Sequence, residues 1–126
     1  MKREALGALG ESVAAQYLEA KGFLIRECNY RVLEGEIDII AEEVGTLVFV
    51  EVKTRRSNKF GLPEEAITRK KRARLIKAAL NYLEERQYHD VNWRFDLIAI
   101  ECHPKGEVSR IEHVEDIIQA ESGEFF

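Results

Sequence analysis

The sequence is poor in cysteine and has no long hydrophobic run. Its longest unbroken apolar stretches, residues 47–50 and 97–100, have four residues each, whereas a membrane-spanning helix needs about 20. Cys28 and Cys102 are too few for a disulfide framework or a zinc site. No apolar segment follows the basic residues at the start, so we expect no secretory signal. These absences argue against a membrane protein and a disulfide-rich secreted domain, and we expect a cytoplasmic protein.

The length and composition fit one globular domain. The chain has 126 residues, close to the usual size of a single domain (~100–150 residues). Hydrophobic residues make up 45% and charged residues 33% of it, which is typical of a folded soluble protein. We expect no special role for the histidines, because they have neither metal-ligand spacing nor clustered acids around them. They are His89, His103 and His113.

The charge is distributed very unevenly along the chain. The net charge of −4 by itself argues against a nucleic-acid partner. Residues 52–77, however, contain ten basic and two acidic residues, a balance of +8, and the remainder carries −12. Such asymmetry favours a polyanion-binding face beside an acidic surface. The alternative is a helix face whose charges only contact water.

Hydrophobic periodicity predicts helices and strands in the order α-β-β-β-α-β-β. Apolar residues three and four apart mark the helices, and runs rich in Val, Ile and Phe mark the strands. The second helix could begin at Pro63 or take Thr68 as its N-cap. The predicted elements are a helix at 4–21, strands at 23–29, 36–44 and 46–54, a helix ending near Arg86, a strand at 93–101 and an edge strand at 108–114.

This order indicates one α/β domain with a mixed central β-sheet flanked by helices. We expect the domain to cover residues 1–114, followed by an acidic C-terminal tail at 115–126 with room for one helical turn before it frays. Residues 29–31 are expected to lead into a turn at Glu34-Gly35. A two-residue turn at Val44-Gly45 is expected to join the two middle strands as a hairpin.

The predicted hairpin places two acids opposite each other. Alternation along residues 47–53 puts Glu51 and Lys53 on one face of the strand. With a two-residue turn, Asp38 falls opposite Glu51, and Glu36 falls opposite Lys53. Like charges directly opposite each other are destabilising, so packing alone does not select this arrangement.

Opposed carboxylates are suited to a divalent cation. Carboxylate oxygens are the ligands that Mg²⁺ or Mn²⁺ prefers, and a neighbouring lysine can stabilise a phosphate or an attacking water. The alternative is that Asp38 and Glu36 only form salt bridges with Lys53 on an exposed sheet face. Beside the +8 segment, the pattern favours a site.

Basic residues after this hairpin are candidates for phosphate contacts. Clusters in a loop commonly bind nucleic-acid backbones without regard to sequence. Positive charges at the start of a helix oppose its dipole, which suggests that they serve a ligand. Charges that only contact water are the alternative in both places. The candidates are Arg55, Arg56 and Lys59 in the loop, and Lys70, Lys71 and Arg74 in the helix.

Two sequence blocks resemble the PD-(D/E)xK signature of restriction-endonuclease-like nucleases. They are Gly-Glu-Ile-Asp-Ile-Ile at residues 35–40 and Phe-Val-Glu-Val-Lys-Thr-Arg at residues 49–55. Ile37 departs from the signature, which nominally has a proline there. Over roughly residues 7–100, the chain resembles the YraN-like family of small uncharacterised bacterial proteins, which is similar to archaeal Holliday-junction resolvases. The other residues that carry this likeness are Gly10-Glu11, Asn29-Tyr30-Arg31, Lys70-Lys71 and Arg94-Phe95-Asp96.

The resemblance implies a restriction-endonuclease-like fold and a role for individual residues. Asp38 and Glu51 match the metal-binding carboxylates, with the backbone carbonyl of Val52 as a further ligand. Lys53 matches the catalytic lysine. Glu11 matches a glutamate of the first helix that reaches the same site in resolvases.

The resemblance also implies a cofactor and partners. The cofactor is Mg²⁺ or Mn²⁺, and the partner is DNA. A homodimer is implied by likeness to resolvases, whose paired sites cut paired strands. The expected nucleic-acid contacts are Arg31, Arg55, Arg56, Lys59, Lys70, Lys71 and Arg74.

The leading hypothesis is metal-dependent hydrolysis of phosphodiester bonds in DNA, including branched DNA. A non-catalytic nucleic-acid-binding or adaptor module that keeps the fold is the alternative. The complete set of Asp38, Glu51 and Lys53 argues against it, because binding alone does not require opposed acids. A hydrolase of small phosphate esters is disfavoured, because the basic segment is longer than a small substrate needs.

Overall fold

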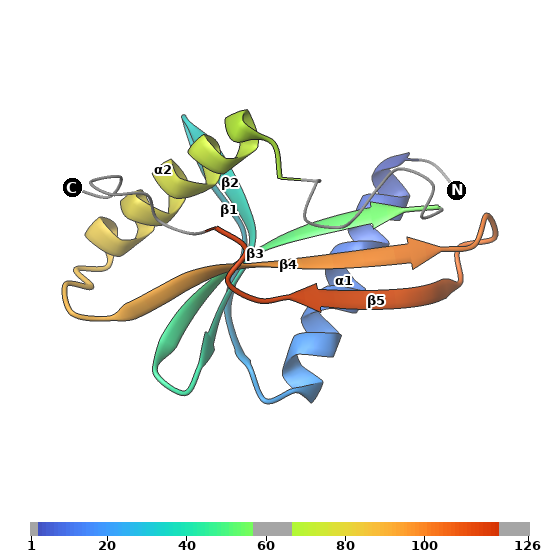
Figure 1. Cartoon of the computed structure of the whole chain (residues 1–126), viewed down its shortest axis with the longest axis horizontal. Helices are drawn as coiled ribbons and strands as arrows, with labels where there is room; N and C mark the ends of the chain where they lie inside the picture. The colour runs from blue at the N-terminus through green and yellow to red at the C-terminus, as the bar shows by residue number, and fades with distance from the viewer. Residues whose placement is uncertain (1–2, 57–66, 119–126) are drawn as a thin grey trace.

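A five-stranded mixed sheet with a helix on each face forms the molecule (Figure 1). The computed structural model describes residues 3–56 and 67–118. The predicted α/β class and element order are confirmed. The elements are α1 (Arg3–Ala20), β1 (Leu24–Val32), β2 (Gly35–Glu43), β3 (Thr46–Arg55), α2 (Arg69–Glu85), β4 (Asn92–Cys102) and β5 (Val108–Val114). No helix in the described ranges is long and apolar enough to cross a membrane.

The strands lie in the order in which they occur in the chain, from β1 to β5. Neighbours are antiparallel except β3 and β4, which are parallel. Parallel neighbours need a long crossover connection, and α2 lies in it. The predicted hairpin register is confirmed from Glu43↔Thr46 to Ile39↔Val50. Its two turn residues, Val44 and Gly45, have φ of 45° and 82°, the positive values that a tight hairpin turn needs.

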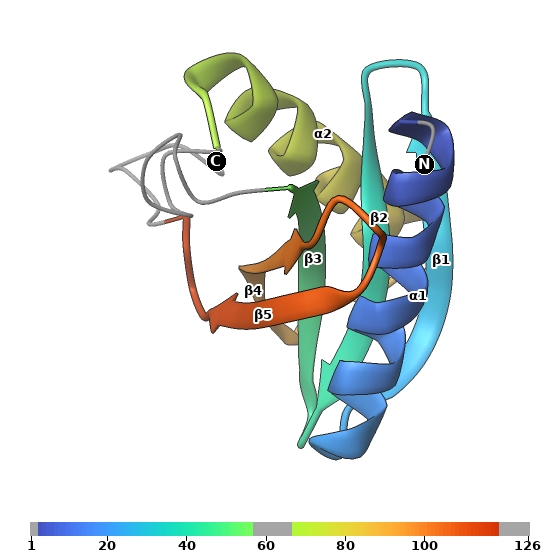
Figure 2. The ribbon, with the colours of Figure 1, turned by 90° about the vertical axis from the view of Figure 1, so that its right-hand side faces the viewer.

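The two helices α1 and α2 lie on opposite faces of the sheet (Figure 2), and a hydrophobic core lies between each helix and the sheet. Leu47 and Phe49 of β3 belong to the core under α2, where the Phe49 ring lies 5.9 Å from that of Tyr82. Val48 and Val50 belong to the core under α1. The alternation that was expected for β3 therefore holds, and it directs Glu51 toward α2.

The first turn of α2 is held close to the sheet. The Thr68 side chain accepts a hydrogen bond from the Lys71 N–H at 3.1 Å, so the predicted N-cap is confirmed; Pro63 lies outside the described residues. At the start of β2, a Cβ added to Gly35 would overlap the carbonyl oxygen of Arg74. The absence of a side chain at Gly35 therefore allows α2 to pack directly against the N-terminal end of β2.

The first strand is longer than the sequence suggests. The chain was expected to enter a turn at residues 29–31, whereas β1 continues to Val32, which pairs with Gly35. The prediction is wrong here because Tyr30 packs into the core under α2, 7% exposed. Burial of this ring keeps the chain extended past the polar Asn29, which itself has a φ of 55°.

The first residues of the predicted C-terminal tail contact the sheet. A tail with room for one helical turn before it frays was expected at residues 115–126, and within it the Ile117 N–H donates to the Phe95 carbonyl at 2.7 Å. Ile118 is 6% exposed and belongs to the core under α2. These two isoleucines supply apolar surface that attaches residues 115–118 to β4. Residues 119–126 lie outside the described part of the chain.

Candidate active site

A cleft of about 570 Å³ lies where the N-terminal turns of both helices meet the ends of β2 and β3. Most of the site residues that were predicted from the sequence line this cleft, although they come from four separate elements. The acidic residues are Glu11, Glu36, Asp38 and Glu51, and the basic residues are Lys53, Lys70, Lys71 and Arg74.

Asp38 contacts the neighbouring strand through its side chain. The β2–β3 ladder ends at Ile39↔Val50, so the expected backbone pairing of Asp38 with Glu51 does not form. Instead, the Asp38 Oδ2 atom accepts a hydrogen bond from the Val52 N–H at 2.8 Å. The alternation of β2 breaks at this residue, because Ile37 and Ile39 belong to different cores. Asp38 still lies beside Glu51 in the cleft, close enough for Glu51 to raise the pKa of the Asp38 carboxyl.

The Asp38 carboxyl holds its proton unusually tightly. Burial, which is the largest cause, and the neighbouring Glu51 carboxyl together raise its pKa from 3.8 to about 8. The Val52 N–H and the Lys71 ammonium lower it, with smaller effects. Two carboxyl groups side by side cannot both be ionised without a nearby cation, so ionisation of Asp38 beside Glu51 requires positive charge in the cleft.

Lys71, rather than Lys53, supplies the charge that contacts Glu51. Glu51 is 8% exposed, and its Oε2 atom lies 2.9 Å from the Lys71 Nζ atom. Lys53 lines the same cleft and is exposed, and it forms no ion pair with any residue in the described ranges. Lys71 was expected only to contact phosphates. The position of Lys71 in the first turn after the Thr68 cap was visible in the sequence. Its pairing with Glu51 was not, because that contact depends on how the β3–β4 crossover places α2.

Glu11 lines the cleft from α1 without joining the carboxylate pair. A Cβ added to the preceding Gly10 would overlap the side chain of Thr54, so this glycine allows α1 to approach the end of β3. Burial raises the pKa of Glu11, and the charges of Asp38 and Glu36 raise it as well. Residues 3–56 and 67–118 nevertheless contain no group of three or more His, Cys, Asp or Glu side chains close enough to hold a metal ion.

The donor set around Asp38 and Glu51 fits a hard divalent cation. The two carboxyl groups offer oxygen ligands, as Mg²⁺ and Mn²⁺ require. The Val52 N–H points to Asp38. The N–H and carbonyl of one strand residue point to the same side of the strand, so the Val52 carbonyl faces the same place. Asp38, Glu51 and the Val52 carbonyl are therefore the residues that could hold the ion.

Comparison with known proteins gives the family of this chain. A model of the uncharacterised protein family UPF0102 matches residues 10–100. The chain belongs to UPF0102. One UPF0102 relative, from Syntrophus aciditrophicus, is 47% identical over 117 residues, which are 93% of this chain and 91% of the relative. Another, from Dictyoglomus turgidum, is 42% identical over 114 residues, 90% of this chain and 97% of the relative. A third, from Geobacter sulfurreducens, is 47% identical over 109 residues, 86% of this chain and 84% of the relative.

Membership of UPF0102 confirms that the chain belongs to a family of small uncharacterised bacterial proteins, as the sequence predicts. These relatives are named only as UPF0102 proteins. Their names state no activity, substrate or cofactor, so the function has to be argued from the geometry of the site.

The other residues of this UPF0102 chain that were predicted to contact nucleic acid differ in whether they line the cleft. Lys70 and Arg74 are exposed in the cleft wall. Arg31 lies outside the cleft lining and pairs with Glu36 at 3.2 Å. The expected pairing of Glu36 with Lys53 is therefore wrong, because the strand ladder ends before it.

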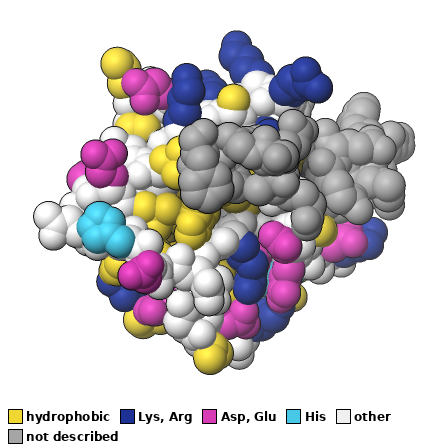
Figure 3. Space-filling view, turned by 60° about the vertical axis from the view of Figure 1, so that its left-hand side comes forward, with side chains coloured by type: hydrophobic (Ala, Val, Ile, Leu, Met, Phe, Trp, Pro, Cys, Tyr) yellow, Lys and Arg dark blue, Asp and Glu magenta, His cyan; other side chains and the backbone are white. Residues whose placement is uncertain are grey.

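Two of the remaining predicted contacts, Arg55 and Arg56, do not line the cleft. Both arginines come after the part of β3 that forms the cleft wall. Lys59 lies outside the described residues. In Figure 3, Lys and Arg side chains gather at the top of the face shown, at the height of α2 and the β1–β2 turn in Figure 1.

A second polar cluster in this UPF0102 fold, on β4 and β5, was not predicted from the sequence. Asp96 is fully buried on β4 and accepts hydrogen bonds from Arg94 at 2.9 Å and from the Asp116 N–H at 2.9 Å. Its Oδ2 atom also lies 2.8 Å from His113 Nε2. Burial by itself raises the pKa of Asp96, but these hydrogen bonds outweigh it and hold the pKa below its ordinary value.

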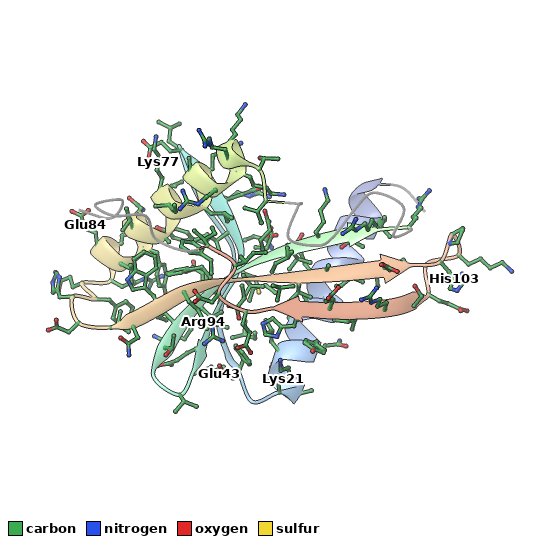
Figure 4. The ribbon with its side chains drawn as sticks, in the orientation of Figure 1. Lys21, Glu43, Lys77, Glu84, Arg94 and His103 are labelled. Atoms are coloured by element: carbon green, nitrogen blue, oxygen red, sulfur yellow. The ribbon has the colours of Figure 1, made fainter. Side chains whose placement is uncertain are left out.

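His113 therefore has a structural role that was not expected. Its other ring nitrogen lies 2.8 Å from the Lys21 ammonium. Arg94 also pairs with Glu43 at 2.9 Å, and these two side chains lie side by side in Figure 4. The alternation of Arg94 and Asp96 was visible in the sequence, but nothing there indicated which residue of β5 would face them.

Proposed function

We propose that this chain is a Mg²⁺- or Mn²⁺-dependent endonuclease that hydrolyses phosphodiester bonds in DNA. The observation that carries the proposal is that the Asp38 and Glu51 carboxyl groups lie side by side in one cleft that is also lined by basic residues. Acids placed together at a cost in repulsion are typical of a cation site. Basic side chains beside them are what a phosphate backbone requires.

Each residue of the cleft has a different role in the proposed hydrolysis. Asp38, Glu51 and the Val52 carbonyl would hold the ion, which when bound polarises a phosphoryl oxygen and makes water a better nucleophile. Lys53 has no ion pair among the described residues, so its ammonium is available to stabilise the charge that develops on the phosphate. Lys70 and Arg74 would hold the backbone on either side.

The arrangement of elements also supports a restriction-endonuclease-like fold. Three antiparallel strands, a crossover helix and a parallel fourth strand place both acids at one end of the sheet, which matches what the sequence resemblance implies. A cytoplasmic location and a homodimer with paired sites belong to the same proposal. Light scattering of the purified protein would test the dimer.

Incubation with linear, flapped and four-way DNA tests the activity. We expect cleavage of at least one substrate with Mg²⁺ or Mn²⁺, and loss of cleavage in Asp38→Asn and Glu51→Gln. Glu42→Gln is the matched control, because Glu42 is also a carboxylate of β2 but pairs with Arg26 at 3.1 Å outside the cleft. Cleavage by Asp38→Asn at the wild-type rate would refute the proposal. DNA binding without cleavage by the wild type would favour the non-catalytic module.

A further inference from the structure

Lys71 and Glu51 form the most buried contact between opposite charges in the cleft. Their charged atoms, Nζ and Oε2, are 2.9 Å apart, and the Glu51 side chain is 10% exposed. A carboxylate with so little access to water needs a cation beside it, because desolvation of an unpaired charge is expensive. In this structure the Lys71 ammonium meets that need.

The backbone of Lys71 is fixed, while its charged end can move. The Thr68 cap accepts the Lys71 N–H, and the close approach of Gly35 to Arg74 keeps this part of α2 against the sheet. The Lys71 side chain, in contrast, is 37% exposed. A flexible four-carbon stem that is partly exposed lets the ammonium leave one anion for another without any movement of the helix.

The ammonium and a divalent ion need the same carboxylate. Mg²⁺ binds oxygen ligands at about 2.0–2.1 Å, and the Lys71 Nζ atom already lies against Glu51 Oε2. Asp38 lines the same cleft beside this carboxylate, so Glu51 has both an ammonium and a second carboxyl group as neighbours. Two cations within about 4 Å of each other repel strongly where water is scarce.

We infer that the Lys71 ammonium holds the place of the divalent cation, so that metal binding and the Lys71–Glu51 ion pair exclude each other. This inference rests on the proposed function of the same site. Metal binding releases Lys71 into a cleft wall that already presents Lys53 and Lys70. The released ammonium is then available to a DNA phosphate. Because coupling between two binding sites is reciprocal, metal strengthens DNA binding, and DNA strengthens metal binding.

Calorimetric titration with Mn²⁺ in the absence of DNA tests this inference without relying on activity. We expect Lys71→Gln to bind Mn²⁺ about tenfold more tightly than the wild type, because a charged hydrogen bond no longer has to be broken. Lys71→Arg retains the charge and should bind no more tightly than the wild type. Lys70→Gln is the matched control, because it removes the same charge from an adjacent residue of the cleft wall that has no ion pair within residues 3–56 and 67–118.

A second measurement guards against a folding defect. Without metal, Lys71→Gln leaves Glu51 buried and without its ion pair, so we expect a lower melting temperature than in the wild type and a larger increase on adding Mn²⁺. Equal gains in Mn²⁺ affinity for Lys71→Gln and Lys70→Gln would overturn the inference, since they would reveal only a general effect of charge. Unchanged affinity in Lys71→Gln would overturn it too. If no protein in the series binds Mn²⁺, the proposed function itself fails and the inference with it.

Discussion

The Asp38 Oδ2 atom lies 2.8 Å from the Val52 N–H, so a side chain of β2 accepts the hydrogen bond that a backbone carbonyl would accept in a regular ladder. This substitution occurs where the β2–β3 pairing ends. It fixes the direction of the Asp38 carboxyl through a backbone group that no mutation of a side chain removes. The candidate metal site is therefore attached to the main chain of β3 and does not depend on packing alone.

The first prediction concerns the pH dependence of stability. The pKa of Asp38 is raised from 3.8 to about 8, so the folded protein binds this proton more tightly than the unfolded chain does. The resulting stability is complete below the ordinary pKa and is lost as the pH rises through the folded pKa. Melting temperatures of the metal-free wild type should fall over this window.

Asp38→Asn should remove most of that pH dependence. The amide oxygen can still accept the Val52 N–H, and the neutral group does not repel Glu51, so at high pH the variant should melt at or above the wild-type temperature without metal. Differential scanning fluorimetry in buffers containing a chelator measures both curves. Parallel curves for the two proteins would show that Asp38 does not carry the effect.

The second prediction concerns the contact between β2 and α2. Gly35→Ala should destabilise the protein by about 1–3 kcal/mol, because the added methyl group meets the backbone of Arg74 and α2 has to shift. Gly7→Ala is the control, because a Cβ there has open space and alanine favours the helix by up to about 1 kcal/mol. Urea denaturation compares the two. Equal stability of the variants would mean that α2 does not need this close approach.

The third prediction concerns the buried cluster on β4. Asp96→Asn should cost about 3 kcal/mol, because Arg94 and His113 lose a fully buried charged partner. Glu43→Gln removes another partner of Arg94, but this side chain is 32% exposed, so the cost should be below about 1 kcal/mol. Chemical denaturation at neutral pH measures both changes.

The same cluster should respond to acid in the direction opposite to Asp38. The pKa of Asp96 is lowered in the folded protein, so its contribution to stability is present above the ordinary pKa and is lost as the pH falls through the folded one. In Asp96→Asn this part of the acid sensitivity should disappear. An unchanged acid limb of the stability curve would contradict the assignment.

The fourth prediction concerns DNA binding. Lys70→Gln should weaken binding to all DNA sequences alike and reduce the slope of log affinity against log salt by about 0.9, the value for one lost phosphate contact. Lys77→Gln is the control, because this exposed lysine of α2 lies outside the cleft and points away from the sheet (Figure 4). Fluorescence anisotropy at several salt concentrations measures the slopes. Equal slopes for Lys70→Gln and the wild type would remove Lys70 from the interface.

Local patterns predicted most of the fold. Alternation and a two-residue turn were sufficient for the register at Ile39↔Val50, and Thr68, one of the two starts predicted for the second helix, is the N-cap of α2. Both signals act over a few residues. They placed Asp38 and Glu51 in the same cleft, although the backbone pairing that was expected between these two residues does not form and the Asp38 side chain accepts the Val52 N–H instead.

Contacts between distant elements could not be predicted in this way. Which lysine contacts Glu51 depends on how the crossover places α2, whereas hydrophobic periodicity predicts only which face of the helix is buried. The contact between Asp96 and His113 depends on the register of β4 and β5, where a shift occurs next to Cys102. A single sequence contains no local signal for either arrangement, because each is decided by packing across the sheet.

The parallel pairing of β3 with β4 has a consequence for the newly made chain. β3 meets β2 through a two-residue turn, but its other edge is covered only when residues 92–102 have been synthesised and have returned over the crossover. At ordinary rates of translation that interval lasts a few seconds. During it, a strand rich in valine with an unpaired edge is exposed to other chains. Growth temperature and expression rate should therefore affect the yield of folded protein more than the stability of the finished fold would suggest.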